Sequence, residues 1–450
     1  MSNQNFSQNF PDYQQDSAEP LIAPDAMNDT LRQQLERIAG QSKAKTDNTL
    51  PTKTESTTVT KSLKTQTLSH ILQSGVDIIL SHSNIDKPLL QSKLDTMYEG
   101  LNSVYEQADI PSSLRTRQFI SKHGLIMSTN HCVTTQRDLF RVRSFIRGVH
   151  HAIKKKLSQT DNKIHLVYPA CGPFAPLLLP LLAHYQHNGE VSPEQLNVTL
   201  IDIQPAAVAS LQAVIRATHL QSFIHKIVCI DACDYQPDIP IDIIVLEAMQ
   251  HGVSREAFIP IARHFANVMK PDAFFLPEKV SVRAVIGVGQ REFVEQWQNQ
   301  RPVEGGNMLT PPNIHRIEMG EVLAITPQFL QLNQDLILDE HTRLLPCAEL
   351  CIPTLIDEQD KPLLLLCTTI NVYGEDTLNE YDSGITHPLP DMQVCINFKP
   401  KDAKPGDLLV NSGDRLKFYY RLNGLPGFMT TLAASPSAKN SKLGVENERI

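Results

Sequence analysis

The spacing of apolar residues predicts helices in the first third of the chain. Apolar residues recur at steps of three and four from Gln66 to near Pro88, and again over Leu89–Ala108 and Val133–Lys156, which is the period of an amphipathic helix. Residues 1–65 are instead rich in Gln, Ser, Thr and Asn with few aromatic residues, and such a composition buries too little surface to offset the ordering entropy. We therefore expect a disordered leader over 1–65 and a helical region over 66–156.

Residues 157–278 alternate between short apolar runs and helical stretches. The runs with strand character are Ile164–Tyr168, Val198–Ile201, Ile227–Ile230, Ile241–Leu246 and Phe274–Leu276. The helical stretches that separate them are Ala175–His187, Pro205–Thr218 and Phe258–Met269. Strands separated by helices of this length form a parallel sheet through right-handed crossovers. The pattern predicts a Rossmann-like α/β domain.

Beyond Glu278 the pattern changes to short extended runs separated by Pro, Gly, Asn and Asp. These runs are Val280–Val288, Val322–Leu330, Gln334–Leu338, Ala348–Ile356, Leu363–Val372, Met392–Phe398 and Arg415–Arg421. They predict a mostly antiparallel β-domain over 279–432, interrupted by a helix and loop excursion at 290–312 and followed by a loose tail over 433–450. The expected fold class is therefore α/β plus β.

Charge and composition exclude several classes of partner. The chain has 41 Lys and Arg residues against 49 Asp and Glu residues, a formal charge of −8, so neither nucleic acid nor an anionic membrane is an expected partner. The N-terminus lacks the pattern of a signal peptide and the apolar runs are too short to span a bilayer, so we expect a soluble cytoplasmic protein.

The cysteines favour reduced thiols over a disulfide framework, because the 8 residues are scattered or lie inside apolar runs. Cys229 and Cys233 are four residues apart, as are Cys347 and Cys351. A zinc site of this kind needs two such pairs held together, and the first pair lies along a predicted strand and its exit. We expect no metal.

The first candidate for ligand binding is the turn after the first predicted strand, Val167–Pro176. In an open parallel sheet the ligand lies beyond the carboxyl ends of the strands, where a turn of small residues lets backbone amides approach it. Ala170, Cys171 and Gly172 provide such residues. An ordinary tight turn is the alternative interpretation.

Acidic residues at the ends of the next two strands favour an adenosine cofactor. Asp202, followed by Ile203, ends the second predicted strand, where a carboxylate can accept hydrogen bonds from both ribose hydroxyls. The alternative is a helix N-cap before Pro205. Asp231 and Ala232 follow the third strand at the position that contacts adenine, although a solvated loop acid fits Asp231 equally well.

The segment after the fourth strand carries two carboxylates. Glu247 ends that strand and Glu256 follows nine residues later across a loop, so the two can clamp a cationic group and stabilise its charge. The alternative for Glu256 is a residue of the first turn of the next helix, favoured there by the helix dipole. His251 between them is a candidate base for a hydroxyl, thiol or amine acceptor, or simply a loop residue.

These features resemble the protein arginine methyltransferases. In that family a double-glutamate loop follows strand four and a proline-containing stretch leads into a β-barrel, as do Glu247-Ala-Met249, Glu256 and the run from Met269 to Pro277 here. Thr386-His387 corresponds to the family's Thr-His-Trp loop, and KPGDLLVNSGDRLKFYYRLN is similar to its closing hairpins. The resemblance spans residues 125–432, and it includes Asp138 and Arg141 in QRDLFRVRSF.

The resemblance implies a class I methyltransferase that uses S-adenosyl-L-methionine, with a C-terminal β-barrel-like domain. It implies that Asp202 holds the ribose, that Arg141 holds the methionine carboxylate, and that Glu247 and Glu256 hold the substrate cation. His387 would line the substrate pocket. Methyl transfer from a sulfonium is an in-line displacement that depends mainly on alignment, so the few acid–base groups suit this chemistry.

The same resemblance assigns the excursion at 290–312 to a dimerisation arm, and so implies a homodimer. The chain departs from the family in its degenerate glycine loop, in Pro388, and in AMQHGVSR, which has no aromatic residue. We therefore expect N-methylation of a protein arginine or of a small amine or peptide. The alternatives are a catalytically inactive scaffold with this fold and an NAD-dependent oxidoreductase, for which the GxGxxG fingerprint is missing.

Overall fold

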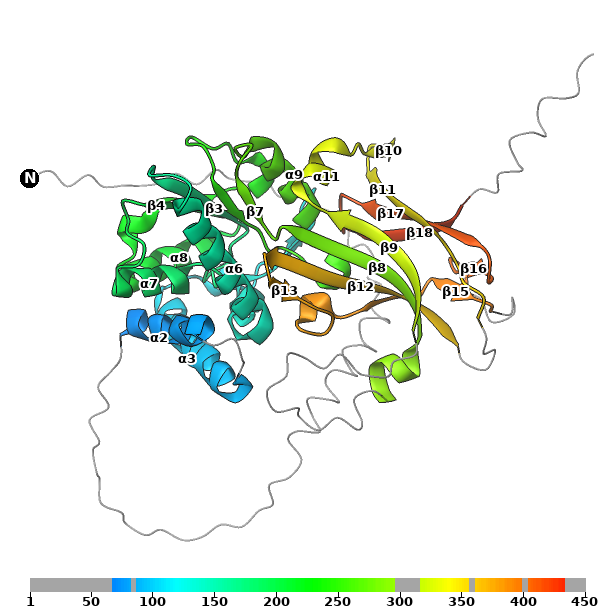
Figure 1. Cartoon of the computed structure of the whole chain (residues 1–450), viewed down its shortest axis with the longest axis horizontal. Coiled ribbons are helices and arrows are strands. Elements are labelled where there is room, and N and C mark those ends of the chain that lie inside the picture. The colour runs from blue at the N-terminus through cyan, green and yellow to red at the C-terminus, as the bar shows by residue number, and fades with distance from the viewer. Residues whose placement is uncertain (1–66, 82–85, 296–315, 356–360, 399–403, 434–450) are drawn as a thin grey trace, which may run out of the picture. The chain divides into compact units, whose positions relative to one another are not determined.

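The computed structural model describes residues 67–81, 86–295, 316–355, 361–398 and 404–433 (Figure 1). They belong to one compact unit, Thr65–Ile450. The predicted leader, most of the excursion and nearly all of the predicted tail lie outside the described residues. Among the helices that are described, we find none with the length and apolar character needed to cross a membrane.

Helices cover one side of the α/β region, as the periodicity of the N-terminal third predicted. Helix α2 (Leu68–Ser81) packs against α7, and α3 (Lys87–Gln107) packs against α2 and α8 (Figure 1). The predicted third helix begins later than expected, because a 3₁₀ turn (Val133–Arg137) precedes α6 (Leu139–Leu157). The carboxylate of Asp138 accepts from the backbone N–H of Arg141 and so fixes that start.

The segment between α3 and α6 contains elements that the sequence did not predict. They are α4 (Ser112–Arg115), β1 (Phe119–Ile120), β2 (Leu125–Ile126) and α5 (Thr129–Cys132). Strands β1 and β2 pair with each other as a small antiparallel hairpin. None of these elements is long enough to give a periodic signal.

The predicted parallel sheet is present, with strand order β5-β4-β3-β6-β7 and parallel pairing throughout. Its strands are β3 (Ile164–Pro169), β4 (Leu196–Asp202), β5 (Ile224–Cys229), β6 (Ile243–Val245) and β7 (Phe274–Leu276). Its helices are α7 (Leu179–Asn188), α8 (Pro205–Thr218) and α9 (Phe258–Val268). All six residues of β3 are buried, which explains why the central strands read as continuous apolar runs.

The C-terminal region is mostly antiparallel, as predicted, while its closure into a barrel stays a prediction. One sheet has the order β13-β12-β8-β9, with β14 also paired to β12, and a second has the order β10-β11-β17-β18. The first contains β8 (Lys279–Val288), β9 (Ile317–Ile325), β12 (Pro362–Tyr373), β13 (Asp376–Leu378) and β14 (Leu389–Asp391). The second contains β10 (Leu336–Asp339), β11 (Thr342–Cys351), β17 (Arg415–Arg421) and β18 (Gly427–Leu432), and β15 (Val394–Ile396) pairs in parallel with β16 (Leu408–Val410).

Two predicted elements had wrong boundaries for local reasons. The strand expected over Val322–Leu330 ends at Ile325, and helix α11 (Pro327–Leu332) follows. The Thr326 hydroxyl accepts from the N–H of Phe329, and proline at the first position suits a helix start. The helix expected from Ala175 begins only at Leu179, because Ala175 has a positive φ of 40°.

Helix α6 connects the α/β region to the β-domain. Gly148 lets it approach β12 closely, since a Cβ at that position would lie 2.6 Å from Cγ1 of Val372. Arg147 donates to Asp376, the first residue of β13, at 2.8 Å. Because α6 also carries Arg141 at its start, these contacts fix the position of the backbone that presents this side chain.

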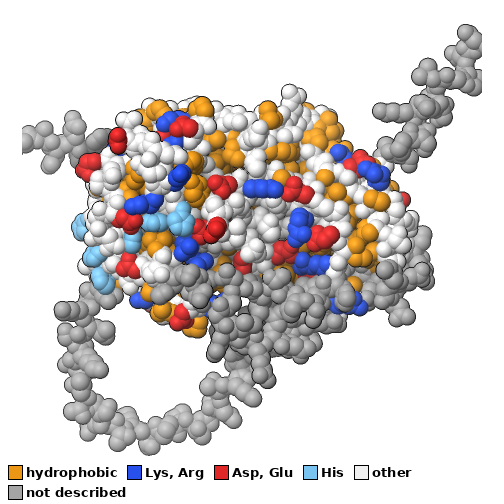
Figure 2. All heavy atoms as spheres, viewed as in Figure 1, with side chains coloured by type: hydrophobic (Ala, Val, Ile, Leu, Met, Phe, Trp, Pro, Cys, Tyr) orange, Lys and Arg blue, Asp and Glu red, His pale blue; other side chains and the backbone are white. Residues whose placement is uncertain are grey.

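Charged side chains of both signs are interspersed on the face drawn in Figure 2. No large patch of one sign covers the described residues on that face. On that face the described acidic residues therefore do not form one acidic surface.

Candidate active site

The candidate site lies where the order of the parallel strands reverses. Strand β3 lies between β4 and β6, so the chain leaves the centre of the sheet first in one direction and then in the other. Ligands in open α/β sheets bind beyond the carboxyl ends of the strands at this point. The loops after β3, β4, β5 and β6 carry most of the predicted residues, whereas Arg141 comes from α6 and His387 from the β-domain.

The loop after β3 is fastened to the end of β4. Ala170 and Gly172 have positive φ values of 50° and 67°, and the N–H of Gly172 donates to Oδ2 of Asp202 at 2.8 Å. The N–H of Cys171 donates to the carbonyl of Ile201 at 3.2 Å. These contacts make the turn part of a fixed arrangement with β4.

Phe174 explains why this turn departs from a glycine-rich loop. Its side chain is buried and meets the ring of Tyr105 edge-on, with 6.0 Å between the ring centroids. The residue therefore packs into the helical layer from α3. A loop with glycine in its place has no such anchor.

Asp202 is buried, with 8% of its surface exposed. Its Oδ1 accepts from the N–H of Gln204 at 2.8 Å while Oδ2 accepts from Gly172. Burial raises the pKa of this carboxyl to about 6, and the two backbone donors act against the rise. The N-cap of α8 is Gln204, so Asp202 does not cap that helix.

The β1–β2 hairpin crosses the end of β4. The Gln204 side-chain amide donates to the carbonyls of Arg117 and Met127, at 2.8 Å and 3.0 Å. The half-buried Ile203 lies beside it. These hydrogen bonds hold both ends of the hairpin against the predicted cofactor residues.

The same hairpin also contacts the glutamate loop. The N–H of Leu125 donates to the carbonyl of Arg255 at 2.8 Å. A Cβ on Gly124 would lie 2.8 Å from the backbone nitrogen of Ala257, so only glycine permits this approach. The hairpin thus links the loops after β4 and β6.

Glu247 follows β6 and forms a buried ion pair with Arg141. Oε2 of Glu247 contacts the guanidinium, and the two side chains are 3% and 14% exposed. Oε1 of Glu247 and Nε of Arg141 are buried and have no hydrogen-bond partner among the described residues. A buried polar atom without a hydrogen-bond partner lowers the stability of the fold. This ion pair therefore has unused hydrogen-bonding capacity within the site.

Glu256 belongs to the same group of charges. Burial raises the pKa of its carboxyl, while Arg141 and a hydrogen bond from Gln250 act in the opposite direction. Arg141 therefore lies within reach of both glutamates. Helix α9 has its N-cap at Ala257, which places Glu256 before the helix and not in its first turn.

The two histidines lie at the β-domain side of the site. His251, in the 3₁₀ turn His251–Val253, is partly buried, and burial lowers its pKa, as do Arg255 and His387. His387 is exposed, and its ring meets Tyr381 edge-on at 5.3 Å. Burial also lowers the pKa of His387, with Asp138 opposing this effect, although its side chain reaches the surface.

The loop that carries His387 is docked onto the start of α6. The 3₁₀ turn Gly384–Thr386 has a capping box formed by Ser383 and Thr386. The Ser383 hydroxyl also donates to Oδ2 of Asp138 at 2.5 Å. This bond joins the loop to the helix that presents Arg141.

Asp231 and Ala232 lie after β5, next to the other predicted cofactor residues. The N–H of Ile230 donates to the carbonyl of Asp202 at 3.2 Å, so the two strand ends touch. Asp231 is partly buried and its Oδ1 accepts from the N–H of Cys233 at 2.9 Å. Ala232 is buried.

Cys132 is a member of the site that sequence reasoning missed. Burial raises the pKa of its thiol, with Asp202 and Glu256 adding to the rise and Arg141 opposing it. Its Cβ lies 3.8 Å from the place that a Cβ on Gly172 would take. Cys132 comes from α5, a single turn with no recognisable pattern, so no sequence signal pointed to it.

Comparison with solved structures finds many similar chains, two of which are protein arginine methyltransferases. No protein-family model matches the chain, and no curated protein does. PRMT1 of Trypanosoma brucei, in an enzyme-prozyme heterotetrameric complex with AdoHcy, is 14% identical with a TM-score of 0.35, over 66% of this chain and 92% of that one. Arabidopsis thaliana Protein Arginine Methyltransferase 10 is 11% identical with a TM-score of 0.37, over 65% of this chain and 87% of that one. At these values the similarities do not decide activity, and the residues of the site bear on function instead.

Proposed function

We propose that this protein is an S-adenosylmethionine-dependent methyltransferase that transfers a methyl group to a nitrogen atom of a cationic or basic acceptor. The observation that carries the proposal is the buried pair of Arg141 and Glu247 at the point where the strand order reverses, each with an unpartnered polar atom. A zwitterionic aminoacyl group and a cationic acceptor are the ligands that satisfy such atoms.

The residues present fit the cofactor. Asp202 keeps free lone pairs for ribose hydroxyls, because each of its oxygens accepts one backbone bond. The guanidinium of Arg141 has an unpartnered Nε for the carboxylate of the aminoacyl group. The bound cofactor would supply an electrophilic methyl group on a sulfonium, and Ala170 to Gly172 would line its approach.

Glu247 and Glu256 are the residues that we assign to the acceptor. The unpartnered Oε1 of Glu247 accepts an N–H of a cationic group without any further desolvation of the carboxylate. When Arg141 turns to a ligand carboxylate, both glutamates lose a positive neighbour and favour a new one. This exchange would couple cofactor binding to acceptor binding.

His251 is the residue that we assign to proton removal. Its lowered pKa keeps the imidazole neutral at pH 7, so it can accept the proton of the nitrogen that is methylated. His387 is exposed and would contact the part of the acceptor that reaches the surface.

Three finer points remain part of the proposal. The acceptor is a protein arginine or a small amine or peptide, since a carboxylate pair serves any of these. Residues 290–312 form the arm of a homodimer, and the β-domain closes in a barrel-like manner. The protein acts in the cytoplasm.

The test combines cofactor binding with product detection. Titration calorimetry with S-adenosylmethionine and with its demethylated product should show binding to the wild type and none to Asp202→Ala. Incubation with cell extract and labelled cofactor, followed by mass spectrometry, should locate the methyl group. Glu247→Gln should still bind the cofactor but lose at least about 100-fold in transfer.

Glu321→Gln is the matched control, because Glu321 is an exposed carboxylate in the β-domain whose partner is Lys279. It should change neither readout. An absence of heat with both cofactor forms would show that the proposal is wrong.

A second candidate function is a scaffold without catalysis, and the packing of Phe174 against Tyr105 favours it. The absence of both cofactor binding and any labelled product would support the scaffold. A nicotinamide absorbance assay tests the NAD-dependent alternative in the same preparation.

A further inference from the structure

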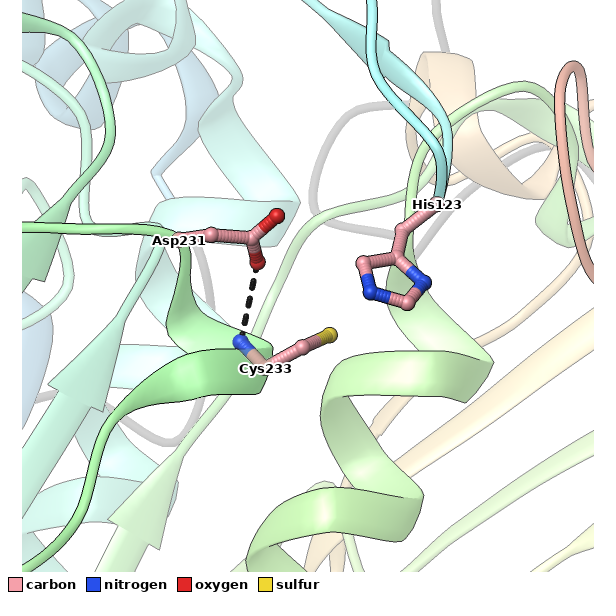
Figure 3. A group of neighbouring side chains, drawn as sticks. All are labelled: His123, Asp231 and Cys233. Carbon is pink, nitrogen blue, oxygen red and sulfur yellow. Dashed lines mark hydrogen bonds between the residues drawn. The ribbon is translucent and has the colours of Figure 1, made fainter.

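Three side chains of different metal-binding types meet outside the carboxylate site. His123, Asp231 and Cys233 each offer one ligand atom, and these atoms lie within 4.8 Å of one another (Figure 3). Among the described residues this is the one group of three or more such side chains that lies so close together. His123 comes from the tip of the β1–β2 hairpin, and the other two come from the turn after β5.

The backbone on both sides is fixed without using these ligand atoms. The N–H groups of His123 and Gly124 both donate to the hydroxyl of Ser121, at 3.1 Å and 3.2 Å. On the other side Oδ1 of Asp231 accepts from the N–H of Cys233, which leaves Oδ2 for another partner. Neither ring nitrogen of His123 has a hydrogen-bond partner in the described part of the chain, and Figure 3 shows the ring facing the thiol.

We propose that His123, Asp231 and Cys233 bind a Zn²⁺ ion, with water at the fourth position. Imidazole, carboxylate and thiolate are the ligands that zinc takes, and three protein ligands with one open position is a common arrangement. The thiolate disfavours Mg²⁺ and Ca²⁺, which prefer oxygen. This inference does not require methyl transfer, although Asp231 is also one of the predicted cofactor residues.

The distances require only a small contraction. Ligand atoms at about 2.0 to 2.3 Å from zinc in a tetrahedron are roughly 3 to 4 Å apart. The three side chains are all partly exposed, so they have room to move by that amount. From the sequence we considered a metal only at the pairs of cysteines and expected none. The group found here takes Cys233 from one such pair without Cys229.

The charges around the group also bear on binding. Burial lowers the pKa of His123, with Lys122 and Arg343 adding to this effect and Asp231 and Asp234 opposing it. Burial and the neighbouring Asp231 raise the pKa of the Cys233 thiol, as does Asp234. The zinc–sulfur bond therefore forms as the S–H bond breaks, and the proton passes to solvent.

A titration of the full chain with Co²⁺, a spectroscopic substitute for Zn²⁺, tests the site. The wild type should develop the absorption of a thiolate bound to Co²⁺, and Zn²⁺ should remove it. Cys233→Ser should abolish this absorption, and His123→Ala and Asp231→Asn should each weaken binding by at least about tenfold. Cys229→Ser is the matched control, because Cys229 is exposed and four residues away, and it should retain the full signal.

A second measurement does not depend on variants. Zn²⁺ should protect Cys233 from alkylation, detected by mass spectrometry, and should slow hydrogen exchange of the amides in 119–126. The proposal is wrong if the wild type gives no thiolate absorption. It is also wrong if the signal survives in Cys233→Ser, or if Zn²⁺ leaves both Cys233 and the hairpin unprotected.

Discussion

The ends of β4 and β6 carry two buried carboxylates that are stabilised by different kinds of donor. Asp202 after β4 receives backbone N–H groups on both oxygens. Glu247 after β6 receives one guanidinium and keeps an unpartnered oxygen. One strand end is therefore satisfied by neutral donors near it, while the other depends on a charge brought from α6.

This difference indicates which side of the site, β4 or β6, can respond to ligands. Backbone donors cannot leave Asp202 without unfolding the turn, so that end is fixed in advance. Arg141 can exchange partners, because its contacts to Glu247 and Asp138 are made by a flexible side chain. Response to a charged ligand is thus concentrated on the β6 side.

The largest expected effect comes from breaking the charge pair. Arg141→Met should reduce the free energy of unfolding by about 3 to 5 kcal/mol at pH 7, because it leaves Glu247 buried and unpaired. The double variant Arg141→Met with Glu247→Met should recover most of that loss. Urea denaturation measures both changes.

Arg415→Met is the control for that experiment, because Arg415 pairs with Glu349 at the surface. It should cost at most about 1 kcal/mol. Equal losses in Arg141→Met and Arg415→Met would contradict the contrast between the two strand ends.

The next effect concerns the β4 side and its dependence on pH. The pKa of Asp202 is about 6 in the folded protein and about 3.9 in the unfolded chain, so the folded state holds the proton more tightly between these values. The free energy of unfolding should therefore fall by roughly 3 kcal/mol from this group as pH rises from about 4 to 6, and change no further above that.

In Asp202→Asn the free energy of unfolding should not show this dependence on pH. It should differ from that of the wild type by a constant amount besides, because one backbone N–H loses its acceptor. The neighbouring Cys132, Cys171 and Tyr168 have raised pKa values and do not titrate in this range. Urea denaturation of both proteins from pH 4 to 7 gives the difference. If the difference in free energy of unfolding between the wild type and Asp202→Asn does not change with pH, the raised pKa of Asp202 is contradicted.

The smallest effect concerns the loop that supports Arg141 from the β-domain. Ser383→Ala removes the hydrogen bond to Asp138 and the side-chain cap of the turn Gly384–Thr386. It should lower the free energy of unfolding by about 1 to 2 kcal/mol. Thermal denaturation checks this, with Ser103→Ala on the exposed face of α3 as the control. A Ser383→Ala protein as stable as the control would show that the loop is held by packing alone.

Much of the framework could be predicted, because it depends on local patterns. Strands β3 and β4 were predicted from short apolar runs, and helix α8 from the helical period of its apolar residues. Asp202 and Glu247 were found because they lie at the ends of such strands. The start of α11 was missed because Thr326, which caps this helix, lies within an apolar run that was interpreted as one continuous strand. Helix α5 and the β1–β2 hairpin are too short to have a pattern.

By itself, the sequence determined the order of helices and strands, the parallel sheet and the acids at its carboxyl edge. Only the tertiary structure decided that Arg141 stands within reach of Glu247 and Glu256, that Cys132 joins them, and that His123 meets Cys233. The physical reason is that backbone preferences and apolar periods act between near neighbours. Contacts between distant segments depend on how hairpins and helix ends pack, for which the chain carries no periodic signal.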